Sequence, residues 1–140
     1  MSAAYSGGCA CGAIRYEIAA DPMMAGHCQC LDCQKATGTG HASMLMFPEA
    51  AMKMTGKAKY YETKADSGNT ASRGFCTNCG SPVLGRSSGF PGMVTVMASS
   101  LDDPNKFQPG FIVYAMRARP WDRVDPALQH FPKMPPAGPS

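Results

Sequence analysis

With 140 residues, 44% of them hydrophobic, and a formal net charge of +3, the chain is long enough for one domain with an ordinary hydrophobic core. No apolar run approaches the roughly 20 residues of a membrane span, and the start, MSAAYSGGCACG, lacks the features of a signal peptide, so we expect a cytoplasmic protein without membrane association. Lysine and arginine are scattered, without a basic run or a basic stripe interleaved with aromatic residues, so we expect no nucleic-acid partner.

Short segments of alternating apolar and polar residues, separated by glycine and proline, predict a mainly β fold. The clearest strand is expected over residues 12–18, where Ile14, Tyr16 and Ile18 alternate with other side chains. Further strands are expected over residues 42–47, 51–55, 59–63, 72–75, 82–86, 93–98 and 111–116. Their spacing predicts a meandering system of small antiparallel sheets.

One short helix is predicted over residues 31–37, because Gly38 is well placed to end it. We expect a single domain over residues 1–131. Residues 132–140, PKMPPAGPS, are rich in proline and are expected to form an extended or frayed tail.

Seven cysteines are the main chemical feature of the chain. They fall into three groups, Cys9-x-Cys11, Cys28-x-Cys30-x-x-Cys33 and Cys76-x-x-Cys79. The odd number and a compartment that keeps thiols reduced favour metal binding over a disulfide framework. Seven thiolates and two Zn²⁺ together carry a charge of −3, which would bring the net charge of the protein to about zero.

Zinc coordination divides the seven cysteines into four and three. A structural zinc takes four protein ligands, whereas a catalytic zinc keeps three and leaves one position open. The simplest division pairs the two dyads in a closed site, the four-cysteine cluster (Cys9, Cys11, Cys76 and Cys79), and leaves an open site, the cysteine triad (Cys28, Cys30 and Cys33). Glycine follows both dyads, at Gly12 and Gly80, and its freedom to adopt positive φ lets backbone N–H groups turn toward the sulfurs.

The cysteine triad suits a reaction of an external thiol. A zinc ion held by three sulfurs can accept such a thiol, favour its thiolate, and polarise a nearby carbonyl. Lys35 and the start of the predicted helix would add positive potential. The alternative is that His27 or His41 closes the site as a fourth ligand, although adjacent extended residues such as His27 and Cys28 point in opposite directions.

Other chemically active residues receive no role from their position in the sequence. His41 and His130 are interpreted as ordinary surface or strand residues. Asp32, His27 and Lys35 lie near the cysteine triad, but proximity alone identifies no general acid or base. The chain has no G-x-S-x-G motif and no phosphate-binding glycine motif, so nucleophilic-serine and nucleotide chemistry are not expected.

The chain resembles the glutathione-dependent formaldehyde-activating enzyme family, which includes the centromere protein V domain. The resemblance rests on the order of three motifs: Gly-Gly-Cys9-x-Cys11-Gly, His-Cys28-x-Cys30-x-x-Cys33-x-Lys-x-x-Gly38 and Phe-Cys76-x-x-Cys79-Gly. It extends from about Gly7 to Phe131. It implies a β-rich fold of several coiled sheets around zinc, called a β-tent, with a structural zinc on the four-cysteine cluster and a catalytic zinc on the cysteine triad.

The resemblance also implies an activity. The family activity is the condensation of formaldehyde with glutathione to S-hydroxymethylglutathione, a carbon–sulfur lyase reaction, so the expected cofactors are two zinc ions and the expected partners are a small thiol and an aldehyde. Two alternatives remain open: a non-catalytic, zinc-stabilised module for protein interaction, and a sensor of thiols or metals.

Overall fold

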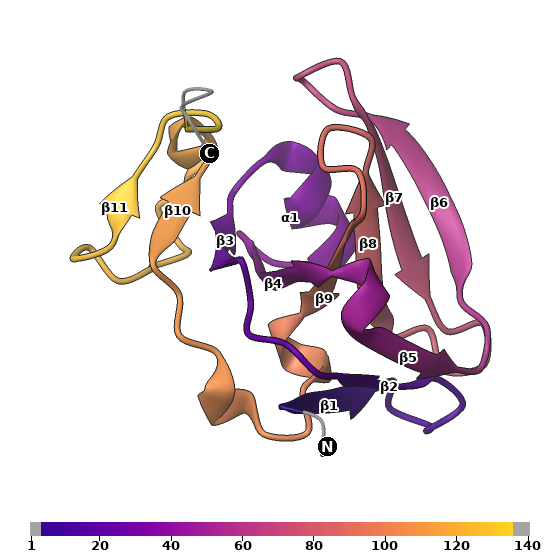
Figure 1. The fold of residues 1–140 in the computed structure, drawn as a ribbon. Helices are drawn as coiled ribbons and strands as arrows, with labels where there is room; N and C mark the ends of the chain where they lie inside the picture. Colours follow the sequence, from indigo (N-terminus) through magenta and orange to yellow (C-terminus); the bar gives the residue numbers. More distant parts are fainter. Residues whose placement is uncertain (1–3, 136–140) are drawn as a thin grey trace. The chain divides into compact units, whose positions relative to one another are not determined.

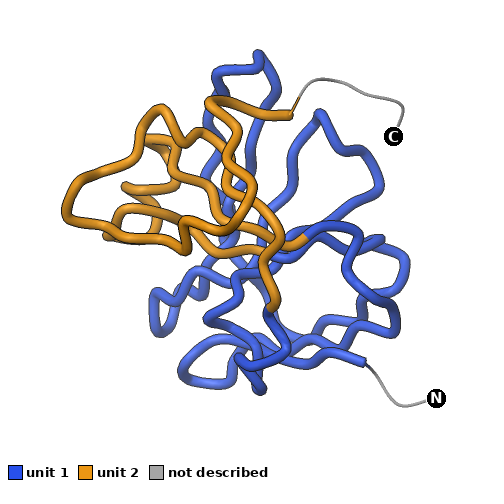
Figure 2. The backbone as a smooth tube through the Cα atoms, turned by 90° about the vertical axis from the view of Figure 1, so that its left-hand side faces the viewer, with its two compact units in different colours: residues 1–24, 45–107 blue, residues 25–44, 108–140 orange. Residues whose placement is uncertain are grey.

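The computed structural model describes residues 4–135 and is mainly β, as the sequence predicts (Figure 1). The chain forms two compact units, each built from two segments (Figure 2). Unit 1 comprises residues 1–24 and 45–107, and unit 2 comprises residues 25–44 and 108–140. Strand β4, Ala42–Pro48, carries the chain from unit 2 into unit 1.

A three-stranded antiparallel sheet in unit 1 contains β1 (Tyr5–Gly8), β2 (Arg15–Ile18) and β5 (Met52–Thr55), in the order β1-β2-β5 (Figure 1). Tyr16 and Ile18 point into the core, while the alternate residues of β2 are exposed. The predicted alternation is therefore confirmed. The strand begins later than predicted, at Arg15, because residues 9–13 form a turn in which Gly12 donates to the Cys9 carbonyl.

A second group of strands in unit 1 follows the predicted meander, in the order β9-β8-β7-β6. The strands are β6 (Lys59–Lys64), β7 (Thr70–Phe75), β8 (Pro82–Ser87) and β9 (Met93–Met97). Adjacent members pair antiparallel, with an irregularity at Gly74 and Phe75. The 3₁₀ turns of this unit are Glu49–Ala51, Ala98–Ser100 and Pro104–Lys106, and the first of them takes up Ala51, so β5 starts one residue later than predicted.

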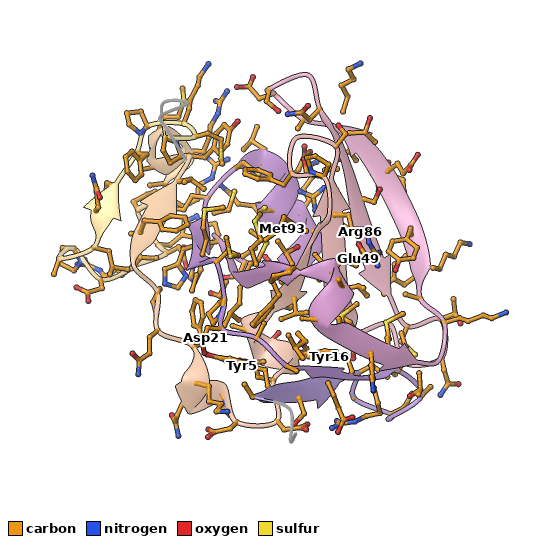
Figure 3. All side chains as sticks on the ribbon, in the orientation of Figure 1. Tyr5, Tyr16, Asp21, Glu49, Arg86 and Met93 are labelled. Atoms are coloured by element: carbon orange, nitrogen blue, oxygen red, sulfur yellow. The ribbon has the colours of Figure 1, made fainter. Side chains whose placement is uncertain are left out.

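Two ion pairs link segments of unit 1 that lie far apart in the sequence. Arg86 on β8 donates from Nε to Glu49 at 2.7 Å, and Figure 3 shows the two side chains pointing toward each other. Arg15 on β2 pairs with Asp102, and this guanidinium, followed by the Ser6 hydroxyl, lowers the pKa of that carboxyl to about 2. Exposed pairs of this kind contribute modestly to stability and chiefly fix loops to strands.

Unit 2 contains β3 (Met24–Cys28, with Met24 in unit 1), helix α1 (Leu31–Thr37), β10 (Phe111–Val113), a 3₁₀ turn (Ala115–Arg117) and β11 (Gln129–His130). The helix matches its predicted bounds, and Gly38 ends it at a φ of 75°. Strand β10 lies between β3 and β11 and pairs with both in parallel. The expected antiparallel pairing does not hold for β10. Residues 29–110 connect β3 to β10 and residues 114–128 connect β10 to β11. Both connections are long enough for a parallel crossover, whereas a tight hairpin would impose antiparallel pairing.

Other differences from the predicted elements are local. The strand predicted over 111–116 stops at Val113, because Tyr114 adopts a left-handed φ of 56° and starts the 3₁₀ turn. Strands β1, β3 and β11 were not predicted; glycine-rich or very short segments give little alternating signal. Of the predicted tail, residues 136–140 lie outside the described part, and the Pro132 and Lys133 carbonyls accept hydrogen bonds from Met116 and Tyr114. The single domain over 1–131 stays a prediction.

No helix among residues 4–135 has the length and apolar character needed to cross a bilayer.

Candidate metal centres

The four-cysteine cluster lies within unit 1. Cys9 and Cys11 follow β1, and Cys76 and Cys79 follow β7, so two turns far apart in the sequence supply the sulfurs. All four sulfurs lie within 4.8 Å of one another. The Cys9 and Cys11 sulfurs are 3.7 Å apart, and those of Cys11 and Cys76 are 3.8 Å apart.

The turns that carry these cysteines have the backbone shape expected from their glycines. Gly12 and Gly80 have φ values of 82° and 78°, and their N–H groups donate to the carbonyls of Cys9 and Cys76. Beside them, the N–H of Ile14 donates to the Cys9 sulfur at 3.2 Å, and that of Asn78 to the Cys76 sulfur at 3.3 Å. The backbone therefore orients and stabilises thiolates, as at known zinc sites.

The cluster fits a tetrahedral zinc. Four ligands at about 2.3 Å from one ion would lie about 3.8 Å from each other, close to the observed sulfur separations. The Ile14 N–H lowers the pKa of Cys9, and the Ser81 hydroxyl lowers the pKa of Cys79 to about 5. Cys9 and Cys79 are thus stabilised as thiolates before any metal charge is added, whereas burial and the neighbouring Cys79 and Cys9 thiols leave the pKa of Cys76 raised. All seven cysteines are free thiols, so the disulfide alternative is not realised.

The cysteine triad lies within unit 2. Cys28 ends β3, Cys30 caps the N-terminus of α1, and Cys33 lies in its first turn. Their sulfurs lie within 4.8 Å of one another, and the Cys33 N–H donates to the Cys30 sulfur at 3.3 Å. Cys28 and Cys33 are buried, whereas Cys30 is partly exposed. The short helix therefore brings two of the three sulfurs together by placing Cys33 one turn after its cap at Cys30, and the end of β3 supplies the third.

A bound cation would stabilise the three sulfurs of the triad as thiolates. The neighbouring Cys30 and Cys33 thiols, followed by burial, raise the pKa of Cys28 well above its usual range. Three crowded sulfurs cannot all carry negative charge without a counter-ion, and a dication such as Zn²⁺ removes this penalty. The donor set, its spacing and its burial therefore fit zinc. Ligation by these residues, and their separate structural and catalytic roles, remain predictions.

No fourth histidine, cysteine, aspartate or glutamate ligand atom joins the triad within this spacing among the described residues. His27 instead forms a hydrogen bond of 2.9 Å between its Nδ1 and the Ser43 hydroxyl, and its ring meets that of His41 edge-on at 4.8 Å. His41 pairs through Nδ1 with Asp122 at 2.7 Å. The alternative in which His27 or His41 closes the site therefore gains no support.

The remaining residues considered from the sequence lie at the surface. His130, on β11, is exposed and bonds through Nδ1 with the Leu128 carbonyl. Asp32 and Lys35 are exposed residues of α1. The structure thus gives none of the three a position that identifies an acid–base role.

A contact that the sequence did not reveal joins α1 to the segment after β10. The Gln34 side-chain amide donates from Nε2 to the Gln29 carbonyl at 2.8 Å and to the Arg117 carbonyl at 3.0 Å. Its Oε1 accepts a hydrogen bond from Arg119 Nε at 2.9 Å. Residues 117–119 are therefore fixed beside the helix that carries Cys33. Arg117 and Arg119 lie 83 and 85 positions from Gln34 in the sequence, so no local pattern could have predicted these contacts.

A comparison with protein-family models decides the family. The model described as glutathione-dependent formaldehyde-activating enzyme matches residues 4–117, most of the chain. The chain belongs to this family. Both cysteine groups lie inside the matched residues, so the family as a whole supports a glutathione-dependent, formaldehyde-activating type of function with cysteine metal sites.

Two further comparisons concern the fold and the curated proteins. A crystal structure of a Rhodobacter sphaeroides protein matches with a TM-score of 0.57 and 16% sequence identity, covering 90% of this chain and 98% of that one. At this identity the likeness shows the fold alone. No curated protein matches the chain.

Proposed function

We propose that the protein is a zinc-dependent carbon–sulfur lyase that joins a small thiol to an aldehyde, similar to S-(hydroxymethyl)glutathione synthase. The observation that carries this proposal is the cysteine triad, in which three sulfurs lie together with no fourth protein ligand among the described residues. A closed structural site has four ligands, so a set of three leaves room for a substrate thiol.

The proposed reaction needs no oxidant or further reactant. The thiol sulfur forms a bond to the carbonyl carbon, the carbon–oxygen π bond opens, and the thiol proton ends on the new hydroxyl group. Zinc, when bound, lowers the pKa of a thiol and polarises a carbonyl. With formaldehyde and glutathione the product is S-hydroxymethylglutathione.

The protein supplies the arrangement of the sulfurs. Buried Cys28 and Cys33 exclude water from one side of the triad, and partly exposed Cys30 leaves it reachable by a small thiol. The Cys33 N–H stabilises the Cys30 thiolate through its 3.3 Å hydrogen bond. We assign the four-cysteine cluster to a second, structural zinc, which makes two zinc ions per chain. A cytoplasmic location, where thiols stay reduced, fits this function.

Exchange of one triad sulfur tests the proposal. In Cys30→Ser we expect the zinc content to fall from about two to about one per chain and the formation of the hydroxymethyl thioether to slow at least about 100-fold. Zinc is measured on reduced protein, its environment is followed by X-ray absorption as glutathione is added, and the reaction rate is measured by exchange NMR. The matched control is Cys79→Ser, which leaves the triad sulfurs intact, and its activity is compared at a temperature at which circular dichroism shows that it is folded.

The outcomes separate the proposal from its alternatives. Unchanged activity and an unchanged zinc environment in Cys30→Ser would contradict it. Two zinc ions that ignore glutathione in the wild-type protein would favour a non-catalytic interaction module. Reversible zinc release on mild oxidation, without turnover, would favour a sensor.

A further inference from the structure

The side chain of Gln34 connects the cysteine triad to an arginine from the other segment of unit 2. Gln34 directly follows Cys33, and its amide is bonded at one end to the Gln29 carbonyl, next to Cys30 in the sequence. At the other end it accepts from Arg119 Nε at 2.9 Å. Two hydrogen bonds and one amide group therefore separate the Arg119 guanidinium from the backbone that leads into the triad.

The rest of the Arg119 guanidinium is available to a ligand. Within residues 4–135, Nε is its only atom with a hydrogen bond, and it forms no ion pair, so both terminal amino groups remain open on an exposed side chain. These two groups are the fork that binds a carboxylate. Pro120 follows and restricts the Arg119 backbone to extended conformations, which limits the movement of the arginine.

Local charge also favours an anion at this point. The amide of Gln34 is neutral, and its Nε2 donates to two backbone carbonyls. Gln34 therefore orients Arg119 without neutralising the positive charge of the guanidinium. Arg117, on the same segment, and Lys35, the next residue of α1, are exposed cations. The first turn of α1 also carries the exposed carboxylate of Asp32, so recognition of an anion rests on the two open amino groups of Arg119.

We propose that Arg119, positioned by Gln34, binds a carboxylate of the substrate thiol and makes the site select thiols that carry a carboxylate over uncharged or esterified ones. This inference rests on the proposed function, because it assumes that the thiol sulfur goes to the triad. It assigns to Arg119 the recognition of the part of the substrate that does not react. Gln34 acts through Arg119 and is a positioning residue.

The test compares two thiols that differ only in their carboxylates. Zinc-loaded protein is titrated calorimetrically with glutathione and with glutathione diethyl ester. Arg119→Gln should weaken glutathione binding about three- to tenfold and change ester binding less than about twofold. Gln34→Ala should produce a smaller loss with the same selectivity. The preference of the wild-type protein for glutathione should also shrink as ionic strength rises.

The matched control is Arg123→Gln, which removes the same charge from an exposed arginine four positions away that has no hydrogen bond or ion pair among the described residues. It should leave both affinities within about twofold. Zinc content and circular dichroism of every variant show that the fold and the triad are retained.

Each result bears on the inference. An equal loss for both thiols in Arg119→Gln, or no loss for glutathione, would overturn it, as would a wild-type protein that binds both thiols equally well. These results leave the proposed function standing. A wild-type protein whose zinc binds neither thiol would overturn the proposed function, and the role of Arg119 would fall with it.

Discussion

At the scale of single residues, the buried tyrosine of β2 joins two parts of unit 1 by one hydrogen bond. Tyr16 is 1% exposed, and its hydroxyl lies 2.6 Å from that of Ser100. Burial raises the pKa of the Tyr16 phenol to about 12, against an ordinary value of 10.0. The folded state therefore holds the phenol proton more tightly than the unfolded state does.

This shift predicts how Tyr16→Phe depends on pH. At neutral pH the variant should lose about 1 kcal/mol of unfolding free energy, because the hydrogen bond between Tyr16 and Ser100 is lost while the Ser100 hydroxyl still donates to the Met97 carbonyl at 2.6 Å. The wild-type contribution of Tyr16 is complete below pH 10 and falls as pH rises from 10 toward 12, since only the unfolded phenol ionises there. The stability difference should therefore shrink at about pH 11. Denaturant unfolding measures it at both pH values.

The control for this variant is Tyr61→Phe, which alters a phenol that is 66% exposed. It should change stability little at either pH. A Tyr16→Phe difference that stays constant between neutral and alkaline pH would contradict the predicted role of the buried phenol.

The sequence predicted residues whose partners are defined by local spacing, and it missed those that depend on tertiary contacts. The three cysteine motifs were visible because metal ligands recur at short intervals along the chain. His41 and Asp122 are 81 positions apart in the sequence, and no local pattern around either residue predicts that they pair. His41 was consequently interpreted as an ordinary residue, although it belongs to a half-buried network with His27.

At the scale of elements, α1 shows which structures local signals define. Its bounds, Leu31–Thr37, match the prediction because its end is set by Gly38, whose N–H donates to the Gln34 carbonyl. The end of β10 could not be predicted, because Tyr114 adopts a left-handed backbone conformation that tyrosine rarely takes. The parallel pairing of β10 was missed for a related reason: it joins segments distant in the sequence.

The cap of α1 can be tested by Gly38→Ala. A Cβ there would meet no atom within 4 Å, so the cost is the left-handed backbone alone, about 1 kcal/mol. Chemical unfolding should show this loss, and zinc at the triad should exchange faster, because Cys33 lies in the same helix. Gly38→Asn should cost less, since asparagine tolerates this conformation. Equal stability of wild type and Gly38→Ala would refute the argument.

At the scale of the whole molecule, the two candidate zinc sites belong to different compact units. The four-cysteine cluster ties the turn after β1 to the turn after β7 within unit 1, closing a long stretch of chain. The cysteine triad draws on β3 and α1 within unit 2. Closed and open sites should therefore differ in how their metal is lost and in what its loss does to the fold.

We expect a chelator to remove the zinc in two steps. The first ion should leave the cysteine triad, which has three ligands, with little change in circular dichroism. Loss of the second, from the four-cysteine cluster, should lower the melting temperature by more than about 10 °C or unfold the protein. A colorimetric zinc indicator and circular dichroism, recorded together, follow both steps.

Cys30→Ser provides the control for the order of release, because it should abolish the first step and preserve the second. Simultaneous loss of both ions with unfolding in the wild-type protein would show that the two sites are not independent.

Unit 2 is assembled from two separate stretches of the chain, and the candidate metal ligands come from only one of them. Residues 25–44 contribute every sulfur of the triad, whereas residues 108–140 contribute Arg119 and Asp122, the partners of Gln34 and His41. The family model stops at residue 117, just before both of these partners. Substitutions over residues 118–125 can therefore change side chains that contact Gln34 and His41 without changing any of the three sulfurs. The same stretch offers protein engineers a short cassette to exchange.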